Sequence, residues 1–189
     1  MNDIVSKFKK LQLISVVMLA LNLAVAIVLY RYPDYSVKVN SLILGGLLMV
    51  HGFFSFIKYF YNKINSKIFS YNLVSGVVAL ILGLFLCLYE VKTISVVGIL
   101  VGIWFVSEAM IEMIRCIKLF KNHEEIAPLV TFSSLIILVM GALIIFNPFP
   151  KYINIPKLIS IFMFAYSVLY GMICLLYRKR AKELLSIFR

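Results

Sequence analysis

The sequence has few charged residues, and very few of them are acidic. Only 14% of its 189 residues are charged, and eight Asp or Glu stand against 19 Lys or Arg. Soluble domains carry about 25% charged residues, so an ordinary soluble domain is excluded. Hydrophobic residues make up 63% of the chain instead. The composition indicates an integral membrane protein, with residues 1–189 forming one membrane domain.

The sequence also lacks the short motifs that mark catalytic, phosphate-binding and metal-binding sites. It contains no HExxH, GxSxG, P-loop or GxGxxG pattern, and its three cysteines form no CxxC pair. His123, Glu124 and Glu125 are adjacent, which is not metal-ligand spacing on a helix, so we expect a solvated charge run there. Cys116 is interpreted as a packing residue rather than an acylation site. We therefore expect no enzyme, no metal and no cofactor.

Long apolar runs are what the sequence has in abundance. An apolar helix needs about 20 residues to cross a hydrocarbon core roughly 30 Å thick. Six runs fit this length, at residues 11–30, 39–60, 70–89, 93–114, 128–146 and 158–177. The first is longer than the core of a signal peptide and precedes no cleavage site, so we interpret it as a retained helix. The chain is predicted to be an all-α integral membrane protein with six transmembrane helices.

Basic residues are distributed unequally between the two sides of these spans. The side of both termini holds 14 Lys or Arg, and the opposite side holds five: Arg31, Lys38, Lys92, Lys151 and Lys157. The positive-inside rule then predicts that both termini are cytoplasmic. This placement accounts for the net charge of +11 without nucleic acid as a partner. Residues 178–189 are basic and amphipathic, and we expect them to bind anionic lipids of the inner leaflet.

The six runs repeat as three hairpins, at about residues 11–60, 70–120 and 128–177, each about 58 residues on from the last. In the second and third hairpins a glycine, Gly83 or Gly141, precedes the outer turn. The even-numbered runs end in a small residue followed by a base, as in Gly52 to Lys58 and Ala109 to Arg115. Three related hairpins predict a pseudo-threefold bundle.

Glycines also mark the faces on which the helices are expected to pack. Gly98 and Gly102 form a small-xxx-small pattern, which lets two helix backbones approach closely. Dimerisation and packing within the bundle are both open, and packing is favoured. Gly83 and Gly141 are assigned to the same kind of contact.

This pattern resembles the HdeD family of bacterial acid-resistance membrane proteins, which are assembled from short hydrophobic repeats of unknown function. The resemblance covers roughly residues 11–178 and rests on Gly83, Gly141, Pro148 in an outer turn, and the ends of the even-numbered runs. It implies a multi-pass protein of the bacterial inner membrane, connected with acid or envelope stress. It supplies no catalytic residues.

Glu108 is the strongest candidate for a functional residue. It lies about 22 Å along a helix that starts at Thr93, inside the cytoplasmic half of the hydrocarbon core. An ionised acid at this depth costs a few kcal/mol unless it is paired, protonated or facing a wet cavity. Glu108 is thus either a proton carrier or sensor, or a member of a structural pair. Glu112 lies three residues before Arg115, and a pair at the helix end explains it.

The repeat places His51, Glu108 and Tyr170 at equivalent positions: His51 lies seven residues before Lys58, Glu108 seven before Arg115, and Tyr170 seven before Tyr177. In a pseudo-threefold bundle these three side chains would meet near the axis. Because histidine titrates near pH 6.5, a His–Glu pair would respond to acid. A hydrogen-bonded polar knot that fixes helix register is the alternative. Other polar residues can join either arrangement: Ser15 and Asn22 on the first helix, and Asn72 and Ser75 on the third.

Two hypotheses about function follow. The first is a non-enzymatic membrane protein of the HdeD type that takes part in acid or envelope-stress tolerance, through oligomers or partner proteins. The second is a small proton-linked or small-solute channel or transporter, with its pathway near His51, Glu108 and Tyr170. In both, membrane lipids and a second copy of the chain are the expected partners.

Overall fold

The computed structural model describes residues 2–61, 69–89, 91–121, 126–147 and 153–187. All secondary structure in this part of the chain is helical, in the order α1 (Asn2–Arg31), α2 (Val37–Tyr61), α3 (Phe69–Leu88), α4 (Ile94–Lys121), α5 (Ala127–Phe146) and α6 (Ile155–Ile187). Each of the six helices contains a stretch that is long and apolar enough to cross a membrane. The predicted all-α fold with six membrane helices is confirmed.

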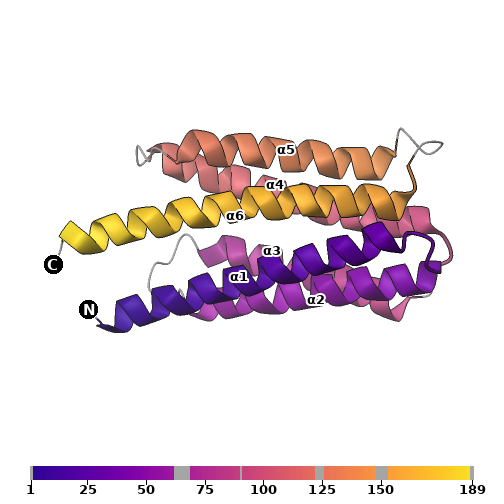
Figure 1. Cartoon of the computed structure of the whole chain (residues 1–189), viewed down its shortest axis with the longest axis horizontal. Helices are drawn as coiled ribbons and strands as arrows, with labels where there is room; N and C mark the ends of the chain where they lie inside the picture. Colours follow the sequence, from indigo (N-terminus) through magenta and orange to yellow (C-terminus); the bar gives the residue numbers. More distant parts are fainter. Residues whose placement is uncertain (1, 62–68, 90, 122–125, 148–152, 188–189) are drawn as a thin grey trace.

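The helices alternate in direction, so the start of α1 and the end of α6 lie at the same end of the bundle (Figure 1). We call this end the chain-end side and the opposite end the far side. Helices α1, α4 and α6 continue past their apolar spans on the chain-end side, and α6 runs on from Leu176 to Ile187. The backbone of 178–187 therefore continues α6 without a break, while the predicted lipid-binding side chains of this tail lie outside the described side chains.

Local sequence sets the helix ends on the far side. The hydroxyl of Ser36 accepts a hydrogen bond from the N–H of Val39 at 3.3 Å, in the first turn of α2. Helix α5 ends at Phe146, and its C-cap residue Asn147 adopts the left-handed conformation with φ of 38° and donates its N–H to the carbonyl of Leu143. Pro156 occupies the first turn of α6, where a missing N–H costs nothing.

The closest helix pairs are α2 with α3, α4 with α5, and α1 with α6. The first two of these pairs join the end of one predicted hairpin to the start of the next. The α1–α6 pair closes the ring, and Figure 1 shows these two helices side by side. Three close helix pairs are thus arranged around a ring of six helices, as expected for a pseudo-threefold bundle.

Glycines permit the two closest of these contacts. A Cβ atom added to Gly83 would lie 2.8 Å from the carbonyl oxygen of Gly45, and one added to Gly102 would lie 3.0 Å from that of Gly141. Gly98, the other glycine of the α4 pattern, faces Ile155 of α6 and Ile144 of α5, so it also contacts neighbouring helices. The glycine face of α4 is therefore occupied within the bundle rather than offered to a second copy.

The far half of the bundle is filled by large apolar side chains. Its fully buried members come from all six helices and include Leu29, Leu44, Leu48, Leu86, Val97, Val101, Trp104, Phe105, Ile144 and Ile159. We call this set the apolar core. Most of the buried polar side chains lie in the chain-end half instead.

Candidate intramembrane polar site

His51 on α2 and Glu108 on α4 meet in the interior of the bundle. The Nε2 atom of His51 lies 3.4 Å from Oε1 of Glu108, and the side chains are 14% and 9% exposed. Each residue lies nine positions before the end of its span, at Phe60 or Ile117, which is about 14 Å of helix. The contact therefore lies near the middle of the membrane, on the chain-end side of the apolar core.

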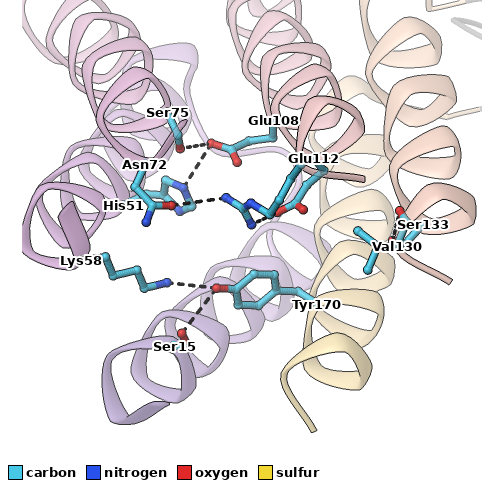
Figure 2. A network of polar contacts seen from close by, with 11 residues as sticks. Ser15, His51, Lys58, Asn72, Ser75, Glu108, Glu112, Val130, Ser133 and Tyr170 are labelled. Atoms are coloured by element: carbon cyan, nitrogen blue, oxygen red, sulfur yellow. Dashed lines mark hydrogen bonds and ion pairs between the residues drawn. The ribbon is translucent and has the colours of Figure 1, made fainter. Parts of the chain in front are cut away.

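Ser75 on α3 completes this site. Its hydroxyl donates a hydrogen bond to Oε1 of Glu108, the same oxygen that faces His51 (Figure 2). A single carboxylate oxygen thus connects α2, α3 and α4. Buried polar groups that lack a partner cost about 1–3 kcal/mol each, and a charged one costs more, so these three side chains depend on one another.

A second polar contact lies one to two helical turns closer to the chain-end side. The guanidinium of Arg115 donates to the carboxylate of Glu112 at 2.6 Å, and its other terminal nitrogen donates to the side-chain oxygen of Asn72 at 3.3 Å. Glu112 and Arg115 form the expected pair three residues apart on α4. The pair is partly buried rather than at the surface, because Asn72 on α3 holds the guanidinium against the bundle.

Tyr170 belongs to a third contact and is not part of the His51–Glu108 site. Its hydroxyl accepts a hydrogen bond from Nζ of Lys58 at 3.0 Å and lies 3.5 Å from the hydroxyl of Ser15. Figure 2 shows these two contacts below the Glu108 level. The repeat thus brings two of the three predicted residues together and places the third one layer away.

Tyr166, one helical turn before Tyr170, is the α6 residue that reaches the centre. Its ring lies 5.8 Å from that of Trp104, and the Trp104 ring lies 5.2 Å from that of His51 in an edge-to-face arrangement. The sequence reasoning missed both Tyr166 and Trp104. The available signal was the spacing of four residues, which puts Tyr166 on the same helix face as Tyr170.

Of the other polar residues that the sequence pointed to, Ser15, Asn72 and Ser75 join these contacts. Asn22 is 4% exposed, and its side-chain oxygen has no hydrogen-bond partner within the described part of the chain. Cys116 is buried beside Ile126, Val130 and Ile173.

No group of three metal-ligating side chains occurs among the residues that the structure describes. The predicted charge run at residues 123–125 and the outer-turn Pro148 lie outside those residues.

The comparisons with known proteins agree with the repeat. The family described as a short repeat of unknown function (DUF308) matches residues 17–88 and again 74–146. The chain belongs to the DUF308 family. The second match starts 57 residues after the first (residue 74 against residue 17), close to the period seen in the sequence. Membrane proteins of the HdeD type belong to the same family.

Each match contains one close helix pair, α2 with α3 in the first and α4 with α5 in the second. No curated protein and no solved structure matches the chain.

Proposed function

We propose that this protein is a non-enzymatic membrane protein of the HdeD type that helps bacteria to tolerate acid or envelope stress, with the His51–Glu108 contact as its acid-responsive element. The observation that carries the proposal is this buried contact between α2 and α4 at mid-membrane. Ionisable residues inside a membrane are expensive and are usually functional. Membership of the DUF308 family, which includes HdeD-type proteins, supports the same assignment.

The chemistry of the pair supports a response to acid. Histidine is the side chain that ordinarily changes charge between pH 5 and 8. A neutral His51 can donate Nε2–H to the Glu108 carboxylate, whereas a protonated His51 forms an ion pair with it. The other groups around this contact are Ser75 on α3, Trp104 on α4 and Tyr166 on α6. The nearest further charges, Glu112 with Arg115 on α4 and Lys58 on α2, lie toward the chain-end side.

We further propose that the protein lies in the bacterial inner membrane with both termini in the cytoplasm. The excess of Lys and Arg on the chain-end side supports this orientation. The polar contacts then lie in the cytoplasmic half of the membrane, and acidification of the cytoplasm is the signal that reaches His51.

A proton-linked or small-solute transporter is the alternative, and the layered polar contacts favour it. Three layers lead from the chain-end side toward mid-membrane: Lys58–Tyr170, Arg115–Glu112 and His51–Glu108. The apolar core blocks the continuation of this path through the far half. Transport would therefore require the helices to separate, whereas an acid-responsive contact works in the arrangement that the structure has.

Acid survival of a deletion strain tests the proposal. The strain is complemented with the wild-type chain, His51→Gln, Glu108→Gln, or Lys121→Gln as a control at the exposed end of α4. We expect the deletion to lower survival and only the wild type and Lys121→Gln to restore it. Normal survival of the deletion strain, or full rescue by both site variants, would contradict the proposal.

Proteoliposomes loaded with a pH-sensitive dye separate the two functions. Proton flux that Glu108→Gln abolishes would establish the transporter instead. Vesicles that stay tight, together with an acid-survival defect, would favour the acid-responsive membrane protein.

A further inference from the structure

A cavity of about 300 Å³ lies on the far side of the bundle, between the start of α2 and the end of α3. Its lining includes Lys38 in the first turn of α2 and Lys92 in the connection from α3 to α4. Both lysine side chains are exposed. They stand far apart in the sequence, so the fold rather than a local basic run brings them to one place. We call this space the lysine cavity.

Basic residues are scarce on this side of the membrane spans. Of the 19 Lys and Arg, five lie in far-side segments, and two of these five line the lysine cavity. The described lining residues include no Asp or Glu, while Glu90, which follows Tyr89 in the sequence, lies outside the described residues. Ammonium groups at one cavity repel each other, and an anion bound beside them relieves the repulsion. The lining therefore favours an anionic ligand.

The inner wall of the lysine cavity is formed where α2 and α3 come closest. A Cβ atom added to Gly45 would lie 2.7 Å from Sγ of Cys87 and 2.9 Å from Cβ of Leu86, and both of these residues line the cavity. Ser41, one turn nearer the start of α2, also lines it, and its hydroxyl donates to the carbonyl of Leu86 at 2.6 Å. The packing of α2 against α3 thus fixes this wall and closes the space toward the bundle interior.

The open side of the lysine cavity faces lipid. Leu42 and Leu88 line it and are 46% and 81% exposed. Leu88 is the last residue of the apolar span of α3, whereas Tyr89 and Lys92 follow that span. Tyrosine rings and lysine ammonium groups favour the headgroup layer of a bilayer, and leucine favours the hydrocarbon. The cavity thus combines a cationic rim at headgroup level with an apolar part that adjoins the acyl chains.

We propose that the lysine cavity binds an anionic phospholipid of the far-side leaflet, with its phosphate at Lys38 and Lys92 and the start of one acyl chain against Leu42 and Leu88. A soluble anion would leave the apolar part of the cavity without a partner. A zwitterionic headgroup would bring a second cation next to the lysines. The site uses neither the polar layers nor the acid response, so its test is independent of the function proposed above.

Cys87 provides a local readout, because it lines the lysine cavity and is half-buried. The full chain in neutral detergent is treated with N-ethylmaleimide at increasing concentrations of phosphatidylglycerol, and mass spectrometry of the modified peptide gives the labelling rate of Cys87. We expect this rate to fall to a plateau with phosphatidylglycerol and to stay nearly constant with phosphatidylcholine of the same acyl chains. Lipid bound to the basic residues of the chain-end side does not reach Cys87, so the readout reports on this cavity.

Two double variants distinguish the site from general surface charge. Lys38→Gln/Lys92→Gln should need about tenfold more phosphatidylglycerol for half-maximal protection, because each lysine near a membrane surface attracts an anionic headgroup. Arg31→Gln/Lys157→Gln is the matched control, since it also removes two exposed positive charges from the far side, but neither residue lines the cavity. The control should be protected as the wild type is.

The proposal is overturned if phosphatidylglycerol leaves the labelling rate unchanged, if phosphatidylcholine protects equally well, or if the two double variants behave alike. Protection by oleate without protection by phosphatidylglycerol would identify a fatty acid as the occupant and would overturn it as well. If Cys87 reacts too slowly, the same measurement on Leu88→Cys decides between these outcomes, because Leu88 lines the same cavity and is the more exposed position.

Discussion

Gly83→Ala should destabilise the bundle although it adds a single methyl group. The added Cβ would lie 2.8 Å from the carbonyl oxygen of Gly45 and 2.8 Å from the backbone nitrogen of Met49. Both atoms belong to the backbone of α2, so no side-chain rotation can relieve the clash, and α3 must move away from α2. Overpacking of this kind costs about 1–3 kcal/mol.

Gly46→Ala is the matched control. Gly46 lies in the same helix as Gly45, but a Cβ atom there meets nothing within 4 Å. Alanine has a higher helix propensity than glycine by about 1 kcal/mol, and both variants gain it. The difference between the two variants therefore isolates the steric cost at the α2–α3 contact, which we expect to be about 1–3 kcal/mol.

Unfolding by SDS in mixed micelles gives both free energies. The emission of Trp104, the single tryptophan of the chain, reports on the process because this residue is buried in the core. Equal stabilities for Gly83→Ala and Gly46→Ala would refute the reasoning, since they would show that the α2–α3 backbones are not in the contact described.

A further prediction concerns the polar site. In the SDS assay, Glu108→Ala should cost about 1–3 kcal/mol more than Glu108→Gln, because alanine leaves both His51 and Ser75 without a partner whereas glutamine can still accept a hydrogen bond; equal costs would show that these contacts do not stabilise the bundle.

The membrane-helix architecture could be read from the sequence because lipid imposes a simple rule. Every backbone polar group must be satisfied within its own segment, so each apolar run of sufficient length becomes a helix. The predicted run at residues 128–146 and the observed helix Ala127–Phe146 differ by one residue. The predicted helix ends were less accurate where a helix continues beyond its apolar span, as α4 does to Lys121 and α6 to Ile187. In these segments the sequence is no longer apolar, but the backbone is still helical.

The choice of helix partners was harder to predict than the helices themselves. The predicted hairpins pair α1 with α2, α3 with α4 and α5 with α6, but the closest approaches are between α2 and α3 and between α4 and α5. In a membrane, close approach depends on small residues that face each other rather than on the length of the connection. Gly45 with Gly83, and Gly102 with Gly141, meet this condition.

The polar site was predicted in part, because the alignment of the repeats was correct for two of its three residues. His51 and Glu108 share a position in the repeat, and the structure brings them together. His51 and Glu108 were counted back from the basic residues Lys58 and Arg115, whereas Tyr170 was aligned by counting seven residues back from Tyr177, at the end of its run. Since that end carries a weaker constraint in α6, which continues to Ile187, the alignment selected a residue one layer too close to the chain-end side.

The two ends of the bundle differ in a way that bears on function. The odd-numbered helices start, and the even-numbered helices end, on the chain-end side, where side chains from both sets form the polar layers around Glu108, Glu112 and Tyr170. On the far side the even-numbered helices start around a cavity, and the interior between cavity and polar layers is apolar. The apolar core thus separates the polar layers around Glu108 from the starts of the even-numbered helices, so a proton path through the whole bundle would need the helices to separate.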